Sequence, residues 1–169
     1  ISGSKFVLNF FKLFFNSFMR EGRVSVKEHN LETVILQDSV DLYNKKIKLE
    51  QASLELSYRG LFASGYFLSD DLIFSANNIE LLSGKIIGKV VELTNGPAIN
   101  TTPFRAQSVL LHYSPYDSNF LIKTASRDIK LYDLYNFNGD LYFDGENLNG
   151  SGDLMEDLFS VQSSHHYFS

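Results

Sequence analysis

Four histidines are the side chains of this chain best suited to bind a metal ion. His165 and His166 are adjacent near the C-terminus, whereas His29 and His112 lie far away in the sequence, and no acidic residue stands at helical spacing from the pair. A zinc site needs three or four ligands that a short motif or the fold brings together. The spacing therefore favours a solvated tail over a metal site.

Acidic residues offer two further possibilities. The Gly-rich run from Asp140 to Asp153 has the oxygen ligands that Ca²⁺ prefers, but not the spacing of a calcium loop, so hairpin turns are favoured. The pairs Asp38/Asp41 and Asp70/Asp71 have no acid–base companion at a fixed spacing. A glycan hydrolase with two carboxylates is the enzymatic alternative. We predict that the protein is not an enzyme and that it holds no metal and no cofactor.

Two surface features could serve binding or modification. Asn100-Thr101-Thr102 and Asn149-Gly150-Ser151 match the glycosylation acceptor, which matters only in a secreted eukaryotic protein. Several tyrosines could stack on a sugar or a partner. The alternative is that they are half-buried strand residues whose hydroxyls contact water. These tyrosines are Tyr113, Tyr116, Tyr132, Tyr135 and Tyr142.

Composition indicates one globular domain without a nucleic-acid partner. The 169 residues are 44% hydrophobic and 14% aromatic, enough for a sizeable core. A net charge of -5 gives no basic stripe for a phosphate backbone. The absence of cysteine suits either a reducing cytosol or a bacterial envelope protein without disulfides. Because the chain starts at Ile1 rather than Met, we expect it to be part of a longer protein.

Residues 1–22 have the pattern of an amphipathic helix. One narrow polar stripe recurs at three- and four-residue spacing, and phenylalanine and leucine cover the remaining face. The run is too short to span a membrane, and Lys12 interrupts it. We expect the helix to cover the domain's own core, with contact to a membrane surface, or the remnant of a signal or anchor segment, as alternatives. Gly22 is expected to end it.

From residue 23 onward the periodicity is that of strands. Short apolar alternations separated by turn residues predict a mainly β domain over residues 23–169, formed by an elongated or rolled antiparallel sheet, taco-like or sandwich. A change of alternation predicts a bulge or turn near Gln51-Ala52. Turns are predicted at Glu28-His29-Asn30, Gln37-Asp38-Ser39, Ser83-Gly84, Asn95-Gly96-Pro97, Ser114-Pro115-Tyr116-Asp117, Asn138-Gly139, Asp144-Gly145 and Asn149-Gly150-Ser151-Gly152.

Two of the predicted strands are apolar on both faces when read as unbroken alternations. Residues 85–93 place Ile86 and Val90 on one face and Ile87 and Val91 on the other, and residues 104–113 are mixed in the same way. A sheet with two apolar faces needs two coverings. Other protein usually provides them, and the alternative is a groove that holds lipid.

Three stretches suggest a family. An apolar helix followed by Glu21-Gly-Arg-Val-Ser-Val26 resembles the AsmA-like bacterial envelope proteins, including their TamB-type members, as does the Gly-punctuated run Phe137–Leu154. The stretch Ala76–Leu93 is similar to the repeat of the OstA-like lipopolysaccharide-transport proteins. The resemblance implies a taco-shaped sheet whose apolar inner groove passes acyl chains between two membranes, in the periplasm or cell envelope.

We therefore expect a lipid-handling envelope module whose partners are phospholipid or lipopolysaccharide. Contact of the helix with a membrane surface is the alternative named above, and neighbouring β repeats or envelope proteins are further partners. The alternative is a structural or interaction repeat of a larger envelope or surface protein, without lipid cargo. We predict that the helix residues Phe10, Phe14 and Phe18 plug or gate the groove. The predicted groove lining is Leu72, Phe74, Ile87, Val91, Phe104 and Leu110.

Overall fold

The computed structural model describes residues 23–27, 32–57, 59–124, 129–156 and 162–168. These residues contain twelve strands in one antiparallel sheet and no helix, so the prediction of a mainly β, antiparallel domain is confirmed. The helix predicted over residues 1–22, with Phe10, Phe14 and Phe18, lies outside the described residues.

The strands follow one another closely in the sequence. They are β1 (Arg23–Lys27), β2 (Glu32–Leu42), β3 (Ile47–Ser57), β4 (Gly60–Leu68), β5 (Leu72–Leu82), β6 (Lys85–Asn95), β7 (Phe104–Ser114), β8 (Asn119–Lys123), β9 (Ile129–Leu131), β10 (Tyr135–Phe143), β11 (Leu148–Glu156) and β12 (Gln162–Phe168). Several of the connections are hairpin turns of two to four residues, as expected for a meander.

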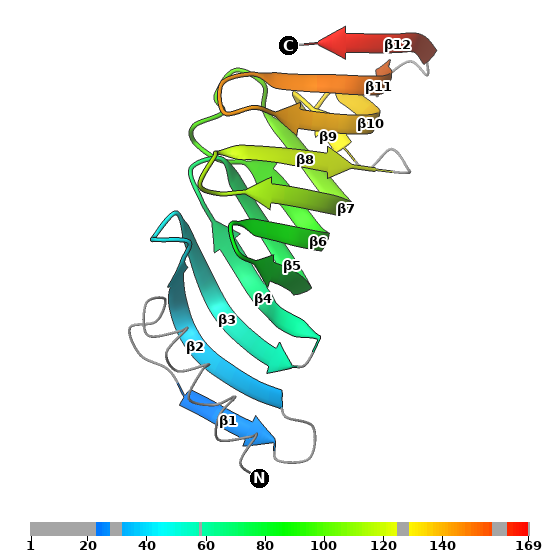
Figure 1. The fold of residues 1–169 in the computed structure, drawn as a ribbon. Coiled ribbons are helices and arrows are strands. Elements are labelled where there is room, and N and C mark those ends of the chain that lie inside the picture. Colours follow the sequence, from blue (N-terminus) through cyan, green and yellow to red (C-terminus); the bar gives the residue numbers. More distant parts are fainter. Residues whose placement is uncertain (1–22, 28–31, 58, 125–128, 157–161, 169) are drawn as a thin grey trace.

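Neighbours in the sequence are also neighbours in the sheet. The strand order runs from β1 to β12, and β8 and β9 share the place between β7 and β10. Figure 1 shows the strands stacked from β1 at one end to β12 at the other. Because every pairing is antiparallel and local, short turns suffice and no crossover helix is needed.

A line of irregular residues crosses the sheet near the middle of its strands, and we call this line the crease. In β3, two residues oppose Gly65 of β4, which is a bulge of the kind predicted near Gln51. Between β6 and β7, Val91 and Ser108 drop out of the pairing. The crease comprises Gln51, Gly65, Asn78, Val91, Ser108, Gly139 and Gly152, and six of these seven residues have positive φ angles.

The crease divides the sheet into two parts that we call leaf A and leaf B. Leaf A comprises residues 39–42, 47–50, 66–76, 92–107, 129–137 and 153–155; leaf B comprises residues 53–64, 79–90, 109–123 and 140–151.

The two leaves fold onto each other. Phe74 of leaf A lies in register with Ala106, which is seven residues from Tyr113 of leaf B, or about 24 Å along a straight strand. Nevertheless, the rings of Phe74 and Tyr113 are 6.5 Å apart. Phe120 lies in register with Tyr113, which is nine residues from Phe104 along β7, yet the ring centroids of Phe104 and Phe120 are 6.0 Å apart. The inner faces of leaf A and leaf B therefore meet.

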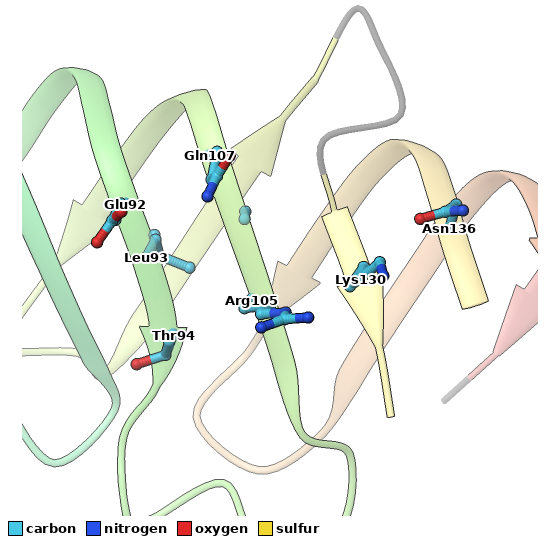
Figure 2. Close-up of a pocket in the computed structure, with 8 residues that line it drawn as sticks. Glu92, Leu93, Thr94, Arg105, Gln107, Lys130 and Asn136 are labelled. Atoms are coloured by element: carbon cyan, nitrogen blue, oxygen red, sulfur yellow. The ribbon is translucent and has the colours of Figure 1, made fainter. Parts of the chain in front are cut away.

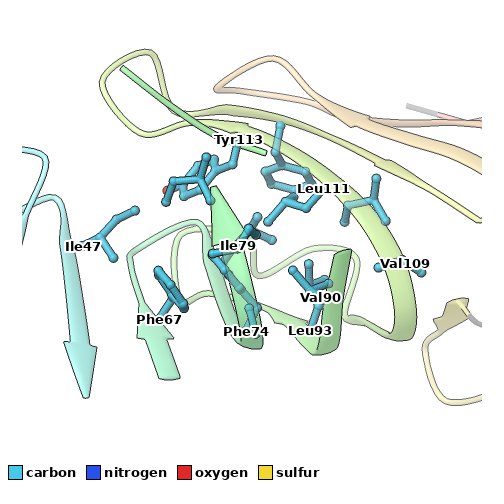
Figure 3. Close-up of a cluster of buried hydrophobic side chains, with 14 of the residues drawn as sticks. Ile47, Phe67, Phe74, Ile79, Val90, Leu93, Val109, Leu111 and Tyr113 are labelled. Carbon is cyan, nitrogen blue, oxygen red and sulfur yellow. The ribbon is translucent and has the colours of Figure 1, made fainter. Parts of the chain in front are cut away.

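Large apolar side chains fill the space between the leaves. Figure 3 shows Phe67, Phe74, Leu93 and Tyr113 converging from different strands, and all four are almost fully buried. Phe67 and Phe74 stack with their ring centroids 4.5 Å apart. This core extends from Val40 and Leu42 of β2 to Leu148 of β11, so that it follows the length of the sheet.

The structure corrects several of the predicted turns. Gln37-Asp38-Ser39 lies within β2, and Asn138-Gly139 and Asn149–Gly152 lie within β10 and β11. The predicted turns at Ser83-Gly84, Asn95-Gly96-Pro97, Ser114-Pro115-Tyr116-Asp117 and Asp144-Gly145 stand where strands end. The turn predicted at Glu28-His29-Asn30 lies outside the described residues. Gly139 and Gly152 belong to the crease and not to a chain reversal. They lie opposite each other in β10 and β11, and a side chain on either would collide with the backbone of the other strand.

A side chain at Gly65 is expected to strain the crease. Its φ angle is +138°, and an added Cβ would lie 2.6 Å from the carbonyl oxygen of Glu50. We expect Gly65→Ala to lower the free energy of unfolding by about 2 kcal/mol or more, measured by urea titration. The control Ser64→Ala, one residue earlier, is expected to cost less than about 1 kcal/mol. Equal losses in the two variants would contradict the role of the crease.

Candidate functional site

The space between the leaves is the first candidate site, because it collects half of the predicted groove lining. Leu72, Phe74 and Phe104 all belong to leaf A and point into the core, with exposed fractions of 0%, 2% and 3%. They are joined there by Phe67 and Phe120, which the sequence analysis did not single out. In the described residues these side chains pack against one another.

The other three predicted lining residues lie on the outer face of leaf B or at the crease. Val91 and Leu110 are 42% and 51% exposed, and Ile87 is half-buried. The six residues therefore do not share one face. Ile87 pairs with His112, which is exposed.

The bulges explain this difference. In β7 the buried residues are Ala106, Val109 and Leu111, spaced three and then two apart, because the crease inserts an extra step at Ser108. The sequence analysis assumed that side chains alternate without interruption along β7, and it therefore predicted Leu110 on the same face as Phe104. The same shift occurs in β6 near Val91. Each strand is thus apolar on one face, with a change of phase at the crease.

Tyr113 joins the rims of the two leaves, by which we mean the turns at their free ends. Its hydroxyl donates a hydrogen bond to Oδ2 of Asp71 at 3.0 Å and lies 2.9 Å from Oγ of Ser69, both in the β4–β5 turn of leaf A. Asp71 is 7% exposed, so Tyr113 satisfies a carboxylate that is largely removed from water. This hydrogen bond offsets part of the free-energy cost of burying the Asp71 carboxylate.

Tyr43 makes a second connection between the rims. It lies in the β2–β3 turn of leaf A. Its hydroxyl is 2.9 Å from the carbonyl oxygen of Leu82 and 2.7 Å from that of Lys85, the two residues that flank the β5–β6 turn of leaf B. Its ring meets the edge of Tyr116, in the β7–β8 turn of leaf B, at a centroid distance of 5.7 Å. Both sets of contacts hold the mouth between the leaves closed.

Burial also changes the acidity of these hydroxyls. Desolvation raises the pKa of Tyr113 well above its ordinary value of 10.0, and the charge of Asp71 adds to the effect although the hydrogen bond with Ser69 opposes it. Desolvation likewise raises the pKa of Tyr43, with a contribution from Tyr116. Both side chains therefore remain neutral donors far above neutral pH.

A second candidate is a hollow of about 490 Å³ on the outer face of leaf A. Leu93 and Ala106, which are buried in the core, line it together with polar residues that surround it (Figure 2). These are Glu92, Thr94, Arg105, Gln107, Lys130 and Asn136. In the figure the side chain of Arg105 extends from β7 in the direction of Lys130 on β9. None of these polar residues was singled out from the sequence, where only their alternation with buried neighbours is visible.

Within the described part of the chain, the residues first considered for metal chemistry form no cluster. Among the described residues no three His, Asp or Glu side chains lie close enough to hold a metal ion. Asp144 instead accepts hydrogen bonds from the backbone N–H groups of Asn147 and Glu146 in the β10–β11 turn, which lower its pKa. His165 and His166 belong to β12, and His29 lies outside the described residues.

The tyrosines considered for stacking are dispersed. Tyr142 is exposed on the outer face of leaf B, whereas Tyr116 and Tyr132 lie in turns. Tyr135 packs against the core, and Tyr113 is fully buried. They do not form one surface.

Comparisons with known proteins provide no family. No family model, no curated protein and no solved structure matches the chain. The part of the chain that the structure describes contains no helix with the length and apolarity that a membrane span requires.

Removing the hydroxyl of Tyr113 is expected to destabilise the closed rims. Tyr113→Phe leaves the buried carboxylate of Asp71 without this donor, so we expect a loss of about 1–3 kcal/mol in the free energy of unfolding, measured by denaturant titration. The control is Tyr132→Phe, whose exposed hydroxyl bonds the carbonyl oxygen of Thr101, with an expected loss below about 0.5 kcal/mol. A Tyr113→Phe variant as stable as the control would disprove the connection.

The raised tyrosine pKa values predict a loss of stability at alkaline pH. Above pH 10.0 the unfolded chain releases tyrosine protons that folded Tyr43 and Tyr113 keep, so the unfolded state binds fewer protons and the free energy of unfolding falls. The slope is about 1.4 kcal/mol per pH unit for each tyrosine. Denaturation between pH 9 and 11 is expected to show a slope that steepens toward this limit as the pH passes 10.0 in the native chain, and a shallower one in the Tyr43→Phe/Tyr113→Phe variant. Identical slopes would contradict the assignment.

Proposed function

We propose that this chain is a lipid-handling module of a cell envelope that holds acyl chains along the space between its leaves. The observation that supports it most is the continuous apolar face that the successive strands direct between the leaves, from β3 to β11. Seven strand spacings of about 4.8 Å make this path about 34 Å long. That length exceeds the hydrocarbon depth of one membrane leaflet, about 15 Å.

Acyl chains would enter this path by parting the rims. The side chains between the leaves already contact one another, so a lipid must displace some of them, and the sites at which the leaves can separate are their free ends. There the Tyr43 and Tyr113 hydroxyls bridge leaf A and leaf B. We propose that these contacts control access, while the crease keeps the leaves joined.

The proposal also draws on the sequence. The resemblance to AsmA-like and OstA-like proteins implies an elongated, taco-like sheet in the periplasm or cell envelope that carries phospholipid or lipopolysaccharide. The apolar pattern of residues 1–22 suits contact with a membrane surface, with Phe10, Phe14 and Phe18 at the mouth of the groove. We propose this family membership, cellular location and role together.

A structural or interaction repeat is the second candidate, and a specific observation favours it. β1 and β12 each pair with only one neighbour among the described strands, so the sheet ends in two edges that could pair with adjacent repeats. In this role the apolar space between the leaves would be a core and nothing more.

Photo-crosslinking can distinguish the lipid-handling module from the structural or interaction repeat. The domain is purified from a bacterial host with ordinary phospholipids and analysed by native mass spectrometry and solvent extraction, with benzoylphenylalanine introduced at Phe74. We expect bound phospholipid or lipopolysaccharide, and crosslinks to its acyl chains, because Phe74 lies between the leaves. The matched control carries the same group at Leu110, on the outer face, where no such crosslink is expected.

A lipid-free mass, with cooperative unfolding that added lipid does not shift, would reject lipid handling and support the repeat. Equal crosslinking from Phe74 and Leu110 would indicate lipid attached to the surface and would also reject the path between the leaves.

A further inference from the structure

Exposed and half-buried apolar side chains gather on the outer face of leaf B. They come from β6, β7, β8 and β10, which lie side by side in this leaf (Figure 1). Leu110 and Tyr142 are 51% and 44% exposed, and Ile87 and Leu121 are half-buried. Ile87, Leu121 and Tyr142 belong to one row across the sheet. His112 completes that row, and Leu110 lies in the next one. This face is suited to contact with another apolar surface.

Charges of opposite sign flank these apolar residues on the two outermost of the four strands. On β6 a lysine stands two residues before Ile87 and another two residues after it, and on β10 two aspartates flank Tyr142 in the same way. These residues are Lys85, Lys89, Asp140 and Asp144. All four are exposed, and none of them makes an ion pair within the residues that the structure describes. The face therefore presents positive charge along β6 and negative charge along β10.

This pattern is complementary to itself under two-fold symmetry. In leaf B the strand order is β6, β7, β8, β10, so β6 and β10 are equally far from a line between β7 and β8. A two-fold axis parallel to that line, above the face, places β6 of one copy over β10 of the other and β7 over β8. The two lysines of each β6 then face the two aspartates of the opposite β10. Ile87 faces Tyr142 of the second copy in the same arrangement.

The centre of this arrangement is apolar. Leu110 of β7 and Leu121 of β8 lie on either side of the axis in neighbouring rows, so the leucines of the two copies interdigitate there. Lys123 stands directly between Leu110 and Asp140 on the same face. Its stem covers Leu110 of the second copy, while its ammonium group reaches toward Asp140 at the margin, as long cationic side chains commonly do.

We propose that the chain forms a symmetric dimer through the outer face of leaf B. An apolar centre with charges at its rim is typical of specific protein interfaces, and the two sets of opposite charges fix the alignment of the copies. With β5 and β11 at the margins, six strands about 4.8 Å apart and five residues long give roughly 500 Å² per copy. The total of about 1,000 Å² is at the lower limit for a specific interface, so the dimer is expected to be weak. The contact does not involve the space between the leaves and does not depend on the lipid proposal.

Sedimentation of the full chain measures this dimer. We expect the native chain to dimerise at about 10–100 μM in analytical ultracentrifugation, as an interface of this size allows. Leu110→Gln is expected to weaken the dimer at least about tenfold, because the symmetry places the substituted residue in the interface twice. Leu110 is half exposed in the single chain, so the substitution leaves the core between the leaves intact.

Charge reversal tests the alignment of the two copies. Lys89→Glu and Asp140→Lys are each expected to weaken the dimer at least about tenfold at about 0.15 M salt, because like charges then face each other at two places. Mixing the two variants in equal amounts is expected to restore association as a heterodimer. The introduced carboxylate of one chain then faces the introduced amine of the other, while the native Asp140 and Lys89 face each other at the second place. Recovery on mixing also shows that both variants are folded. Asp144 is left unchanged because it holds the β10–β11 turn.

The matched controls carry the same charge changes at exposed positions away from this face. They are Lys46→Glu, in the β2–β3 turn, and Glu92→Lys, on the outer face of leaf A, and both are expected to dimerise as the native chain does. A native chain that stays monomeric at about 100 μM would overturn the proposal, as would equal weakening in the controls or no recovery on mixing. Phosphatidylglycerol vesicles that bind the native chain but not Lys89→Glu, without a dimer in solution, would assign this face to a membrane instead and would also overturn it.

Discussion

The mid-strand crease is the constraint on which the rest of this structure depends. An antiparallel meander of this length, if flat, would leave one apolar face exposed to water. Bulges and positive φ angles at Gln51, Asn78 and Ser108, with Gly65 between the first two, bend the strands instead. The bend brings Phe74 and Tyr113 into contact, although they lie in opposite leaves, on either side of the crease. One sheet thereby covers its own apolar face.

Local patterns predicted the strands, whereas the geometry of the crease remained hidden. Alternation and turn residues sufficed for the mainly β class and for the bulge at Gln51. The pair Asn138-Gly139 has the composition of a hairpin turn, but it lies inside β10, where glycine is needed because the backbone of β11 approaches closely. A bulge is a local change of phase that apolar spacing alone does not locate. Leu110 and Val91 were therefore assigned to the same face as Phe104.

The candidate sites depend on contacts between residues far apart in the chain, and sequence gives little indication of these. Nothing near Tyr113 in the sequence indicates that it bonds Asp71, 42 residues away. The opposition of Arg105 and Lys130 arises because β8 and β9 divide one place in the sheet. Burial of Phe74 and Phe104 was predictable, since large apolar residues in an alternating strand usually face a core.

The packed space between the leaves sets a limit on any lipid path. Burying an acyl chain contributes about 0.8 kcal/mol per methylene, so about fourteen methylenes contribute about 11 kcal/mol. Displacing a leucine or phenylalanine into water costs about 1.5–3 kcal/mol, so one chain offsets about four to seven such side chains. A core that extends from β2 to β11 contains many more. In the proposed lipid path, entry would therefore be local, beginning at the rims near Tyr43 and Tyr113 and advancing a few side chains at a time, while the crease and the rest of the core stay packed.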